Sequence, residues 1–292
     1  MNELMGLTMA MHLLDRVENA LMVLSEAIFA RWPRSCPGSE RLQHCRIVAH
    51  RGEHDNRLTF ENTLAAFDAA VAAGVWGIEF DIRWTKDFQP VVIHDPGLQR
   101  VFGVKLTVAG ATRAELRQRC PHVPSLAEVI QRYGGKAHLM VEIKQEHTPD
   151  PARQNRVLGE LFSGLTPGQD FHLISLTPQL FRPLTFAPKS ALVPIARLNP
   201  GKFGRLAARE GYGGLAGHYA VVGRSDIEQQ HAAGRKVGTG YVRAPNCLLR
   251  ELNRGVDWIF SNHAAEVQAL LRRLQSAESR AACSRPLRSS TK

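Results

Sequence analysis

Two carboxylates interrupt an apolar run that otherwise reads as a β-strand. The run is GIEFDI at residues 77–82, and its acids are Glu79 and Asp81. Residues two apart in a strand share one face, so both acids point one way and the apolar side chains the other. The run HLMVEI at 138–143 repeats the pattern with Glu142. Carboxylates that converge at low dielectric need a cation, and hard oxygen ligands without cysteine favour Mg²⁺ or Ca²⁺ over zinc.

A second interpretation stays open from spacing alone. The wet face of an antiparallel strand shows the same alternation of acidic and apolar residues. The recurrence of the pattern in VEIK, residues 141–144, favours acids that face the inside of a closed sheet, because two separate strands end in the same way.

Two histidines also end apolar runs. His50 ends IVAH and His94 ends VVIH, and a turn residue follows each. A lone histidine in this position is more often structural. Two imidazoles beside an acidic metal cluster and the cations Arg51 and Lys144 favour phosphoryl transfer, because metal and cations bind a phosphodiester while one imidazole accepts a proton and the other donates one. Asp95 is expected to be structural, since neighbouring residues of a strand point apart.

The chemistry-bearing runs belong to a longer alternation of strand-like and helix-like segments. Strict alternation predicts a parallel sheet, and eight units over roughly 230 residues match a (β/α)₈ TIM barrel. A doubly wound open sheet is the alternative, but HRGEHDN after the first strand lacks the G-x-G-x-x-G turn. The predicted strands are 46–49, 77–82, 138–143, 171–176, 191–196, 213–217, 235–242 and 257–262. The predicted helices are 63–74, 125–135, 225–234, 245–255 and 263–274.

Three segments lie outside the regular alternation. Residues 1–45 are expected to form an N-terminal helical extension and linker before a barrel domain at 46–272. Residues 96–124 form a short insertion after the second strand, which we expect to continue into a turn and return as VVIHD. Residues 273–292 are basic and rich in serine, and are expected to be a disordered tail.

The N-terminal extension has a helical apolar stripe. Such a stripe most often packs on its own domain, and a dimer seam or peripheral contact with a membrane surface are the alternatives. The sequence does not fix the oligomeric state. The stripe consists of Leu14, Val17, Leu21, Leu24 and Ile28.

Composition limits the function classes. The chain has 292 residues, 44% of them hydrophobic, a formal charge of +10 and a pI near 9.8, which favours anionic partners. The excess cations are scattered and show no aromatic-interleaved patch, so nucleic-acid binding is not predicted. Five cysteines without a C-x-x-C pair indicate neither a disulfide framework nor a zinc site. With no evident leader or membrane span, a cytoplasmic location is expected.

At this point the motifs combine into a family pattern. The stretch from AHRG at 49 to VFG at 103 resembles the glycerophosphodiester phosphodiesterase family, with its HRG, ENT, E-x-D, T-x-D and HD signatures in order, and MVEIK resembles that family's E-I-K strand. The resemblance implies a TIM barrel that uses a divalent cation to hydrolyse glycerophosphodiesters to glycerol 3-phosphate and an alcohol.

The resemblance also implies roles for individual residues. The acid/base pair would be His50 and His94. The metal ligands would be Glu79, Asp81 and Glu142. The phosphate contacts would be Arg51 and Lys144, and the ENT residues Glu61 and Asn62 would line the substrate site from the start of the first helix, where a capping role is the alternative.

Several departures from the family pattern leave the substrate open. The K-D-G turn of the family reads K-D-F here, so Phe88 replaces a glycine, the residue that tolerates positive φ. The run VGTGYVR replaces a W-T-V-N type run in the seventh strand, and GVDWIFSN replaces G-V-D-G-I-I-T-D. Two alternatives therefore remain beside the phosphodiesterase: a lysophospholipase D acting at a membrane surface, and a barrel that binds a phosphoester without turning it over.

Overall fold

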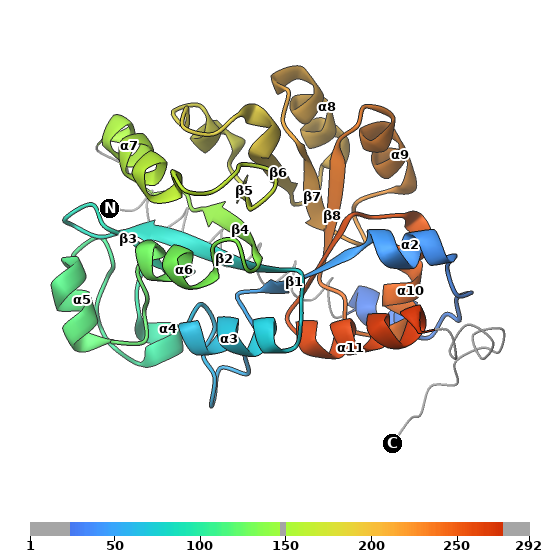
Figure 1. Cartoon of the computed structure of the whole chain (residues 1–292), viewed down its shortest axis with the longest axis horizontal. Helices are drawn as coiled ribbons and strands as arrows, with labels where there is room; N and C mark the ends of the chain where they lie inside the picture. Colours follow the sequence, from blue (N-terminus) through green and yellow to red (C-terminus); the bar gives the residue numbers. More distant parts are fainter. Residues whose placement is uncertain (1–23, 147–149, 277–292) are drawn as a thin grey trace, which may run out of the picture.

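Eight parallel strands close into a barrel, as the sequence predicts. The computed structural model describes residues 24–146 and 150–276. The parallel strands follow one another around the ring in the order β1-β9-β8-β7-β6-β5-β4-β2, and pairing of β1 with β2 closes it (Figure 1). The strands are β1 (Arg46–His50), β2 (Gly77–Trp84), β4 (His138–Ile143), β5 (Phe171–Ser175), β6 (Leu192–Ala196), β7 (Gly214–His218), β8 (Lys236–Gly240) and β9 (Trp258–Ser261).

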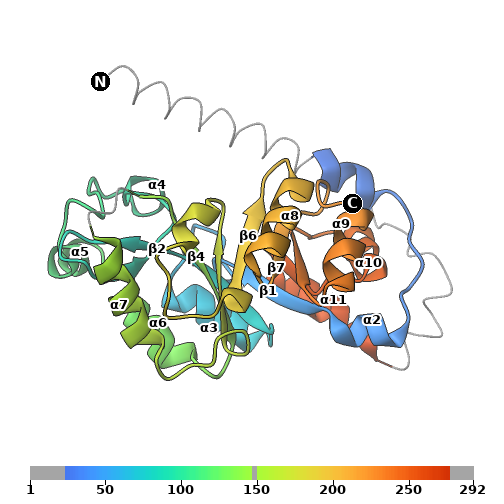
Figure 2. The ribbon, with the colours of Figure 1, turned by 90° about the horizontal axis from the view of Figure 1, so that it is seen from above.

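Helices follow the strands and form the outer layer (Figures 1 and 2). The five predicted helices are confirmed as α3 (Leu64–Ala72), α6 (Leu126–Tyr133), α9 (Arg224–Ala232), α10 (Pro245–Arg254) and α11 (Ala264–Gln275). The sequence prediction missed α2 (Ser39–His44), α7 (Pro151–Phe162), α8 (Pro200–Glu210) and the 3₁₀ turns η1 (Pro178–Phe181) and η2 (Lys189–Ala191).

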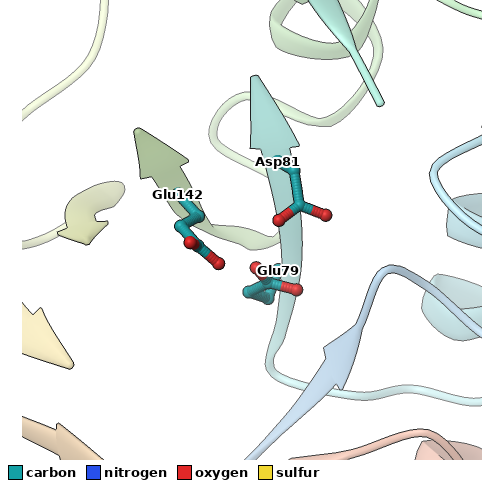
Figure 3. Close-up of side chains that lie close together, drawn as sticks. All are labelled: Glu79, Asp81 and Glu142. Atoms are coloured by element: carbon teal, nitrogen blue, oxygen red, sulfur yellow. The ribbon is translucent and has the colours of Figure 1, made fainter. Parts of the chain in front are cut away.

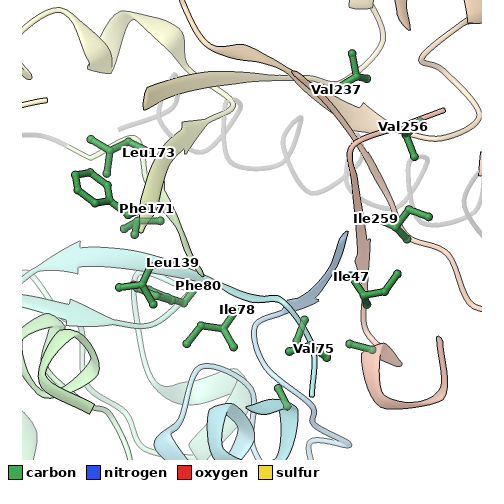
Figure 4. Close-up of a cluster of buried hydrophobic side chains, with 14 of the residues drawn as sticks. Ile47, Val75, Ile78, Phe80, Leu139, Phe171, Leu173, Val237, Val256 and Ile259 are labelled. Carbon is green, nitrogen blue, oxygen red and sulfur yellow. The ribbon is translucent and has the colours of Figure 1, made fainter. Parts of the chain in front are cut away.

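The outward faces of the strands form the main hydrophobic core with these helices. Ile78 and Phe80 of β2 are fully buried in this core, and the Phe80 ring lies 5.6 Å from the Phe67 ring of α3. Figure 4 shows this layer around the outside of the sheet. The acids between these apolar residues therefore face the barrel interior. A smaller interior cluster includes Met140, Trp258 and Phe260.

The predicted insertion packs around a core of its own beside the barrel mouth. It follows β3 (Pro90–Val92), which returns antiparallel to β2 and ends before His94. The helices α4 (Gln99–Phe102) and α5 (Arg113–Arg119) follow. Phe88 in the connecting turn has φ 61°, as the K-D-G resemblance predicts. The Arg153 guanidinium lies 4.3 Å from the centre of the Phe88 ring, so α7 covers this turn.

The chain before β1 is more structured than a linker. Residues 24–30 are helical and α2 lies next to α10 and α11. In Figure 2 these two blue helices lie at different ends of the barrel. The predicted stripe residues before Leu24 and the predicted tail after Ser276 lie outside the described residues. Within the described part, none of the helices has the length and hydrophobicity to cross a membrane.

Candidate active site

The three predicted carboxylates meet at the carboxyl end of β2 and β4. Glu79, Asp81 and Glu142 each offer an oxygen within 4.8 Å of the others, and all three are buried (Figure 3). Asp81 and Glu142 are direct partners in the register of the two strands. Because β2 carries acids at two consecutive inward positions, the neighbouring strand needs to add only one to complete the cluster.

Burial and mutual repulsion perturb the ionisation of this cluster. Burial first, and then the Asp81 and Glu142 charges, raise the pKa of Glu79 well above its ordinary value of 4.5. Burial likewise raises the pKa of Glu142. Burial would also raise the pKa of Asp81, but nearby Lys144, His94 and Arg51 hold it well below 3.8. The cluster thus has excess negative charge at its centre, which a divalent cation would neutralise.

Both predicted phosphate-binding cations contact the carboxylates. The Lys144 ammonium lies 2.7 Å from Asp81 Oδ1 and 2.8 Å from Glu142 Oε1. Arg51 donates its backbone N–H to Glu79 Oε2 at 3.0 Å, and its Nε lies 3.4 Å from Asp81 Oδ2. Arg51 has φ 57°, a backbone conformation that turns the chain sharply at the end of β1.

Asn62 supports a candidate metal ligand. Its Nδ2 donates to Asp81 Oδ2 at 2.8 Å, and its Oδ1 accepts from the Asp81 backbone N–H at 3.3 Å. Its φ of 58° turns the side chain back toward β2. The cap of α3 is its neighbour Thr63, whose side chain accepts from the Ala66 N–H at the start of the helix.

Glu61 is buried among polar partners. It accepts from Arg51 Nη1 at 2.9 Å, from Arg100 Nη2 at 2.6 Å and from Asn56 Nδ2 at 2.7 Å. Burial alone would raise its pKa, but these two guanidinium groups lower it to about 2. Its carboxylate therefore holds the Arg51 side chain, and its place in the substrate site stays a prediction.

His50 faces the carboxylate cluster. Its Nε2 lies 3.8 Å from Glu79 Oε2. On the other side of the ring, Nδ1 lies 2.6 Å from Asn262 Oδ1. With the amide oxygen as acceptor, Nδ1 carries the proton, so Nε2 of the neutral ring has its lone pair directed toward the cluster. Burial and the Arg51 charge lower the pKa of His50 well below 6.5.

Tyr241, just beyond β8, covers the His50 ring at a centroid distance of 4.5 Å. The run VGTGYVR, which departs from the W-T-V-N type run of the family pattern, thus brings an aromatic side chain to the site.

The His94 ring contacts the side chain of its sequence neighbour Asp95, although the sequence predicted that these two side chains point apart. His94 Nδ1 lies 2.7 Å from Asp95 Oδ1. The expectation that the two side chains point apart assumed a strand, but β3 ends at Val92 and His94 lies in a bend. Asp95 also accepts from Arg100 Nη2 at 3.0 Å. Arg83 Nε donates to the His94 carbonyl at 2.7 Å and fixes the backbone of the bend.

Sequence reasoning missed Asn262, Tyr241 and Arg100 as parts of this site. Asn262 comes directly after β9, and His50 is the last residue of β1, so the place of Asn262 at the end of a barrel strand was a usable signal. Arg100 lies in the insertion, and no spacing rule links it to Glu61 or Asp95.

A separate hollow of about 630 Å³ lies at the opposite end of the barrel. Its lining includes Arg46 and Lys236, which begin β1 and β8, and the aromatic residues Trp76 and Trp258. Catalytic residues of TIM barrels lie at the carboxyl ends of the strands, so the carboxylate cluster is the candidate active site.

Comparisons with known proteins agree with this geometry. Residues 50–162 match the model of the glycerophosphoryl diester phosphodiesterase family. The chain is 36% identical over 110 residues to a glycerophosphodiester phosphodiesterase of Caldanaerobacter subterraneus subsp. tengcongensis, which covers 34% of this chain and 44% of that relative. It is 44% identical over 71 residues to lysophospholipase D GDPD1 of Rattus norvegicus, which covers 24% and 22%. The matches thus span less than half of each relative.

Solved structures share the fold over a greater length. A glycerophosphodiester phosphodiesterase of Thermotoga maritima has a TM-score of 0.65 at 22% identity, covering 78% of this chain and 98% of that one. A phosphodiesterase of Oleispira antarctica, in complex with the product sn-glycerol-3-phosphate, has a TM-score of 0.64 at 22% identity, covering 78% and 96%. Residues 50–162 thus match the glycerophosphoryl diester phosphodiesterase family, and the barrel shares the fold of these solved structures.

Proposed function

We propose that this protein hydrolyses glycerophosphodiesters to glycerol 3-phosphate and an alcohol, with the help of a divalent cation. The observation that carries the proposal is a buried cluster of three carboxylates at the barrel mouth, with His50 beside it. The family match and the product complex of the Oleispira antarctica neighbour support the same substrate class.

The residues present fit a hard divalent cation. Glu79, Asp81 and Glu142 would supply oxygen ligands, and Asn62 fixes the orientation of the Asp81 carboxylate. Mg²⁺ and Ca²⁺ both accept such ligands. A bound cation would neutralise these carboxylates and polarise a phosphoryl oxygen. Arg51 and Lys144, which lie against the carboxylates, would add positive charge for the phosphate of the substrate.

The two imidazoles have different partners, which favours different roles. His50 donates its Nδ1 proton to the neutral amide of Asn262, so its Nε2 can accept a proton at the site. His94 is bound to the Asp95 carboxylate, which stabilises the positive charge of an imidazolium. We therefore assign proton acceptance to His50 and proton donation to the leaving alcohol to His94.

Phosphorus NMR of reaction mixtures tests the proposal. Glycerophosphocholine, glycerophosphoethanolamine and glycerophosphoglycerol are incubated with purified protein and with Mg²⁺, Ca²⁺ or excess chelator. We expect glycerol 3-phosphate with one of the two ions, no product with chelator, and no product from His50→Ala or His94→Ala. His122→Ala, at an exposed histidine, is the matched control and should retain activity. Binding of diester without any product would instead support a non-catalytic barrel.

Lysophospholipase D activity is a second candidate. The relative named lysophospholipase D GDPD1 supports it, as do the exposed Leu24 and Ile28 of the N-terminal helix, which would suit a peripheral membrane contact. Lysophosphatidylcholine added to the same panel decides between the candidates. Release of choline and lysophosphatidic acid at a rate above that for glycerophosphocholine would favour the lysophospholipid as substrate.

A further inference from the structure

We propose that the catalytic face of the barrel docks on an anionic lipid surface through three arginine–apolar pairs. The pairs, which we call rim pairs, are Arg31–Trp32, Arg57–Leu58 and Arg197–Leu198. Trp32, Leu58 and Leu198 have exposed fractions of 59%, 91% and 58%. Together with Leu24 and Ile28, they are all the exposed large hydrophobic residues in the described part of the chain.

The rim pairs lie at or near one end of the barrel. Leu58 belongs to the loop that leaves the carboxyl end of β1, and Leu198 to the loop that leaves β6. The helical segment 24–30 is attached at the same end, because Glu26 accepts from Tyr219 Oη at 2.8 Å, just after β7, and from the Arg243 N–H, just after β8. Around the ring, these attachment points follow the order β1, β8, β7 and β6.

The loops that present these residues are held in shape. Asp55 Oδ1 accepts from the backbone N–H groups of Arg57, Leu58 and Thr59 at 2.9 to 3.0 Å, so Leu58 projects from a fixed turn. Asn246 Nδ2 donates to the Ala30 carbonyl at 2.7 Å and fixes the end of the helical segment just before Trp32. Leu58 has an exposed fraction of 91%, and because its turn is structured, the fold itself keeps this side chain in solvent.

The chemistry of the rim pairs selects a lipid surface over a protein partner. The apolar side chains lie on separate loops, whereas a protein interface would need one contiguous, shape-complementary patch. A fluid bilayer accepts separate insertions, and a guanidinium next to an apolar side chain suits contact with the lipid phosphates. The formal charge of +10 adds a general attraction to an anionic leaflet.

Docking in this way would present the barrel mouth to lipid headgroups. This consequence rests on the proposed function, since it makes a lysophospholipid within a bilayer accessible to the carboxylate cluster. The docking itself does not depend on hydrolysis, so it is tested with the inactive His94→Ala chain in chelator.

Vesicle flotation measures the docking directly. The His94→Ala chain is mixed with vesicles of phosphatidylcholine alone, or of phosphatidylcholine with about 30% phosphatidylglycerol, at low salt. We expect flotation with the anionic vesicles only. Failure to float with them would overturn the proposal and point to a protein partner for these residues, and equal flotation with neutral vesicles would overturn the role of the arginines.

Two variants identify the surface that binds. Arg57→Gln/Arg197→Gln should weaken binding roughly 25-fold, because each arginine near an anionic surface contributes roughly a fivefold change. The matched control is Arg156→Gln/Arg205→Gln, at exposed arginines of the outer helices α7 and α8, and should bind within about twofold of the parent. Equal weakening by both variants would mean that net charge alone drives binding, and would overturn the proposal.

The apolar residues are tested by their own variant and by fluorescence. Trp32→Ser/Leu58→Ser/Leu198→Ser, in the otherwise wild-type chain, should lose flotation yet hydrolyse soluble glycerophosphocholine at the parent rate. Trp32 is strongly exposed, whereas Trp84 and Trp258 are buried. Its emission should therefore shift to shorter wavelength on anionic vesicles and be quenched by brominated lipid. An unshifted, unquenched spectrum on bound protein would contradict insertion, whether or not the triple variant folds.

Discussion

At the scale of single residues, the most informative feature is how each of the two proposed catalytic imidazoles is oriented. His50 has a neutral amide at Nδ1 and His94 has a carboxylate. Asn262 lies 212 positions from His50, and Asp95, the immediate neighbour of His94, was expected to point away from it. The sequence indicated the two imidazoles and the three acids, because these residues can be recognised from their residue types and from their spacing in the strand-like runs. Their supports depend on loop geometry that spacing does not encode.

Asp95 is predicted to position His94. Asp95→Ala should lower kcat for glycerophosphocholine roughly 10- to 100-fold with little change in KM, because the ring loses its fixed orientation and its charge partner. Steady-state kinetics measures the split. Asp95→Asn keeps an acceptor for the Nδ1 proton and should retain more activity than the alanine variant. Equal, unchanged kcat values for both variants would show that His94 needs no partner.

Asn62 is predicted to support ion binding through Asp81. Asn62→Ala removes both hydrogen bonds to that residue and should weaken divalent-cation affinity about 10-fold or more, as is usual when the partner of a metal ligand is lost. Titration calorimetry with Mg²⁺ or Ca²⁺ measures the change. Asn155→Ala, on the outer helix α7, is the control and should leave the affinity unaltered. An unaffected Asn62→Ala affinity would contradict this supporting role.

At the scale of elements, the helices that sequence predicted and those it missed differ in their signals. α6 has an apolar face and a capping box, in which Ser125 and Glu128 bond each other's backbone N–H groups. α7 and α8 begin with proline after Asp150 and Asn199, which are good start signals, but the first buries only Leu158 and Phe162. With so few buried residues, hydrophobic periodicity has little to detect.

The capping box of α6 makes a measurable prediction. Ser125→Ala should lower the free energy of unfolding by about 1 kcal/mol, because the Glu128 backbone N–H loses its acceptor and Glu128 loses the Ser125 hydroxyl. Urea denaturation measures the difference. Ser163→Ala, at the exposed end of α7, should change it by less than about 0.5 kcal/mol. A change at Ser125 no larger than this control would contradict the contribution of the cap.

At the scale of the whole molecule, two departures from the family pattern prove to be connected. Gly238 of β8 and Trp258 of β9 are direct partners in the strand register. A Cβ atom on Gly238 would lie 2.7 Å from the Phe260 ring and 3.3 Å from the Trp258 ring. Trp258 and Phe260 of β9 thus occupy the space next to Gly238 that a larger side chain of β8 would need. Sequence alone showed both changes but could not pair them, because register is a property of the closed sheet.

The barrel interior also contains a buried histidine pair that sets a pH dependence of stability. His138 Nδ1 donates to the Gln169 carbonyl, so its Nε2 accepts from His172 Nδ1 at 2.8 Å, and both rings are neutral. Burial lowers the pKa of His138 to about 4 and, with the His138 charge, that of His172 to about 3. The two histidines of the unfolded chain bind protons near pH 6.5. The contribution of the pair to the free energy of unfolding is therefore fully present above that pH and is lost as pH falls toward 3.

Urea unfolding between pH 7 and 4.5 tests this pair. The wild-type chain should lose about 2 kcal/mol or more from these two groups over that interval. His172→Gln removes one titrating ring but keeps a donor for His138 Nε2, so its stability should fall less steeply with decreasing pH. His122→Gln, at an exposed ring, should follow the wild-type slope. Identical slopes for all three proteins would contradict the assignment.

The central claim is that a divalent ion binds between acids from β2 and β4, with an imidazole beside it. X-ray diffraction from crystals grown with Mn²⁺ tests it most directly, by anomalous scattering. The account predicts one peak at about 2.0 to 2.5 Å from oxygens of Glu79, Asp81 and Glu142, and its loss in Glu79→Gln/Asp81→Asn. A barrel mouth without a peak at millimolar Mn²⁺, or a peak ligated by other residues, would contradict it.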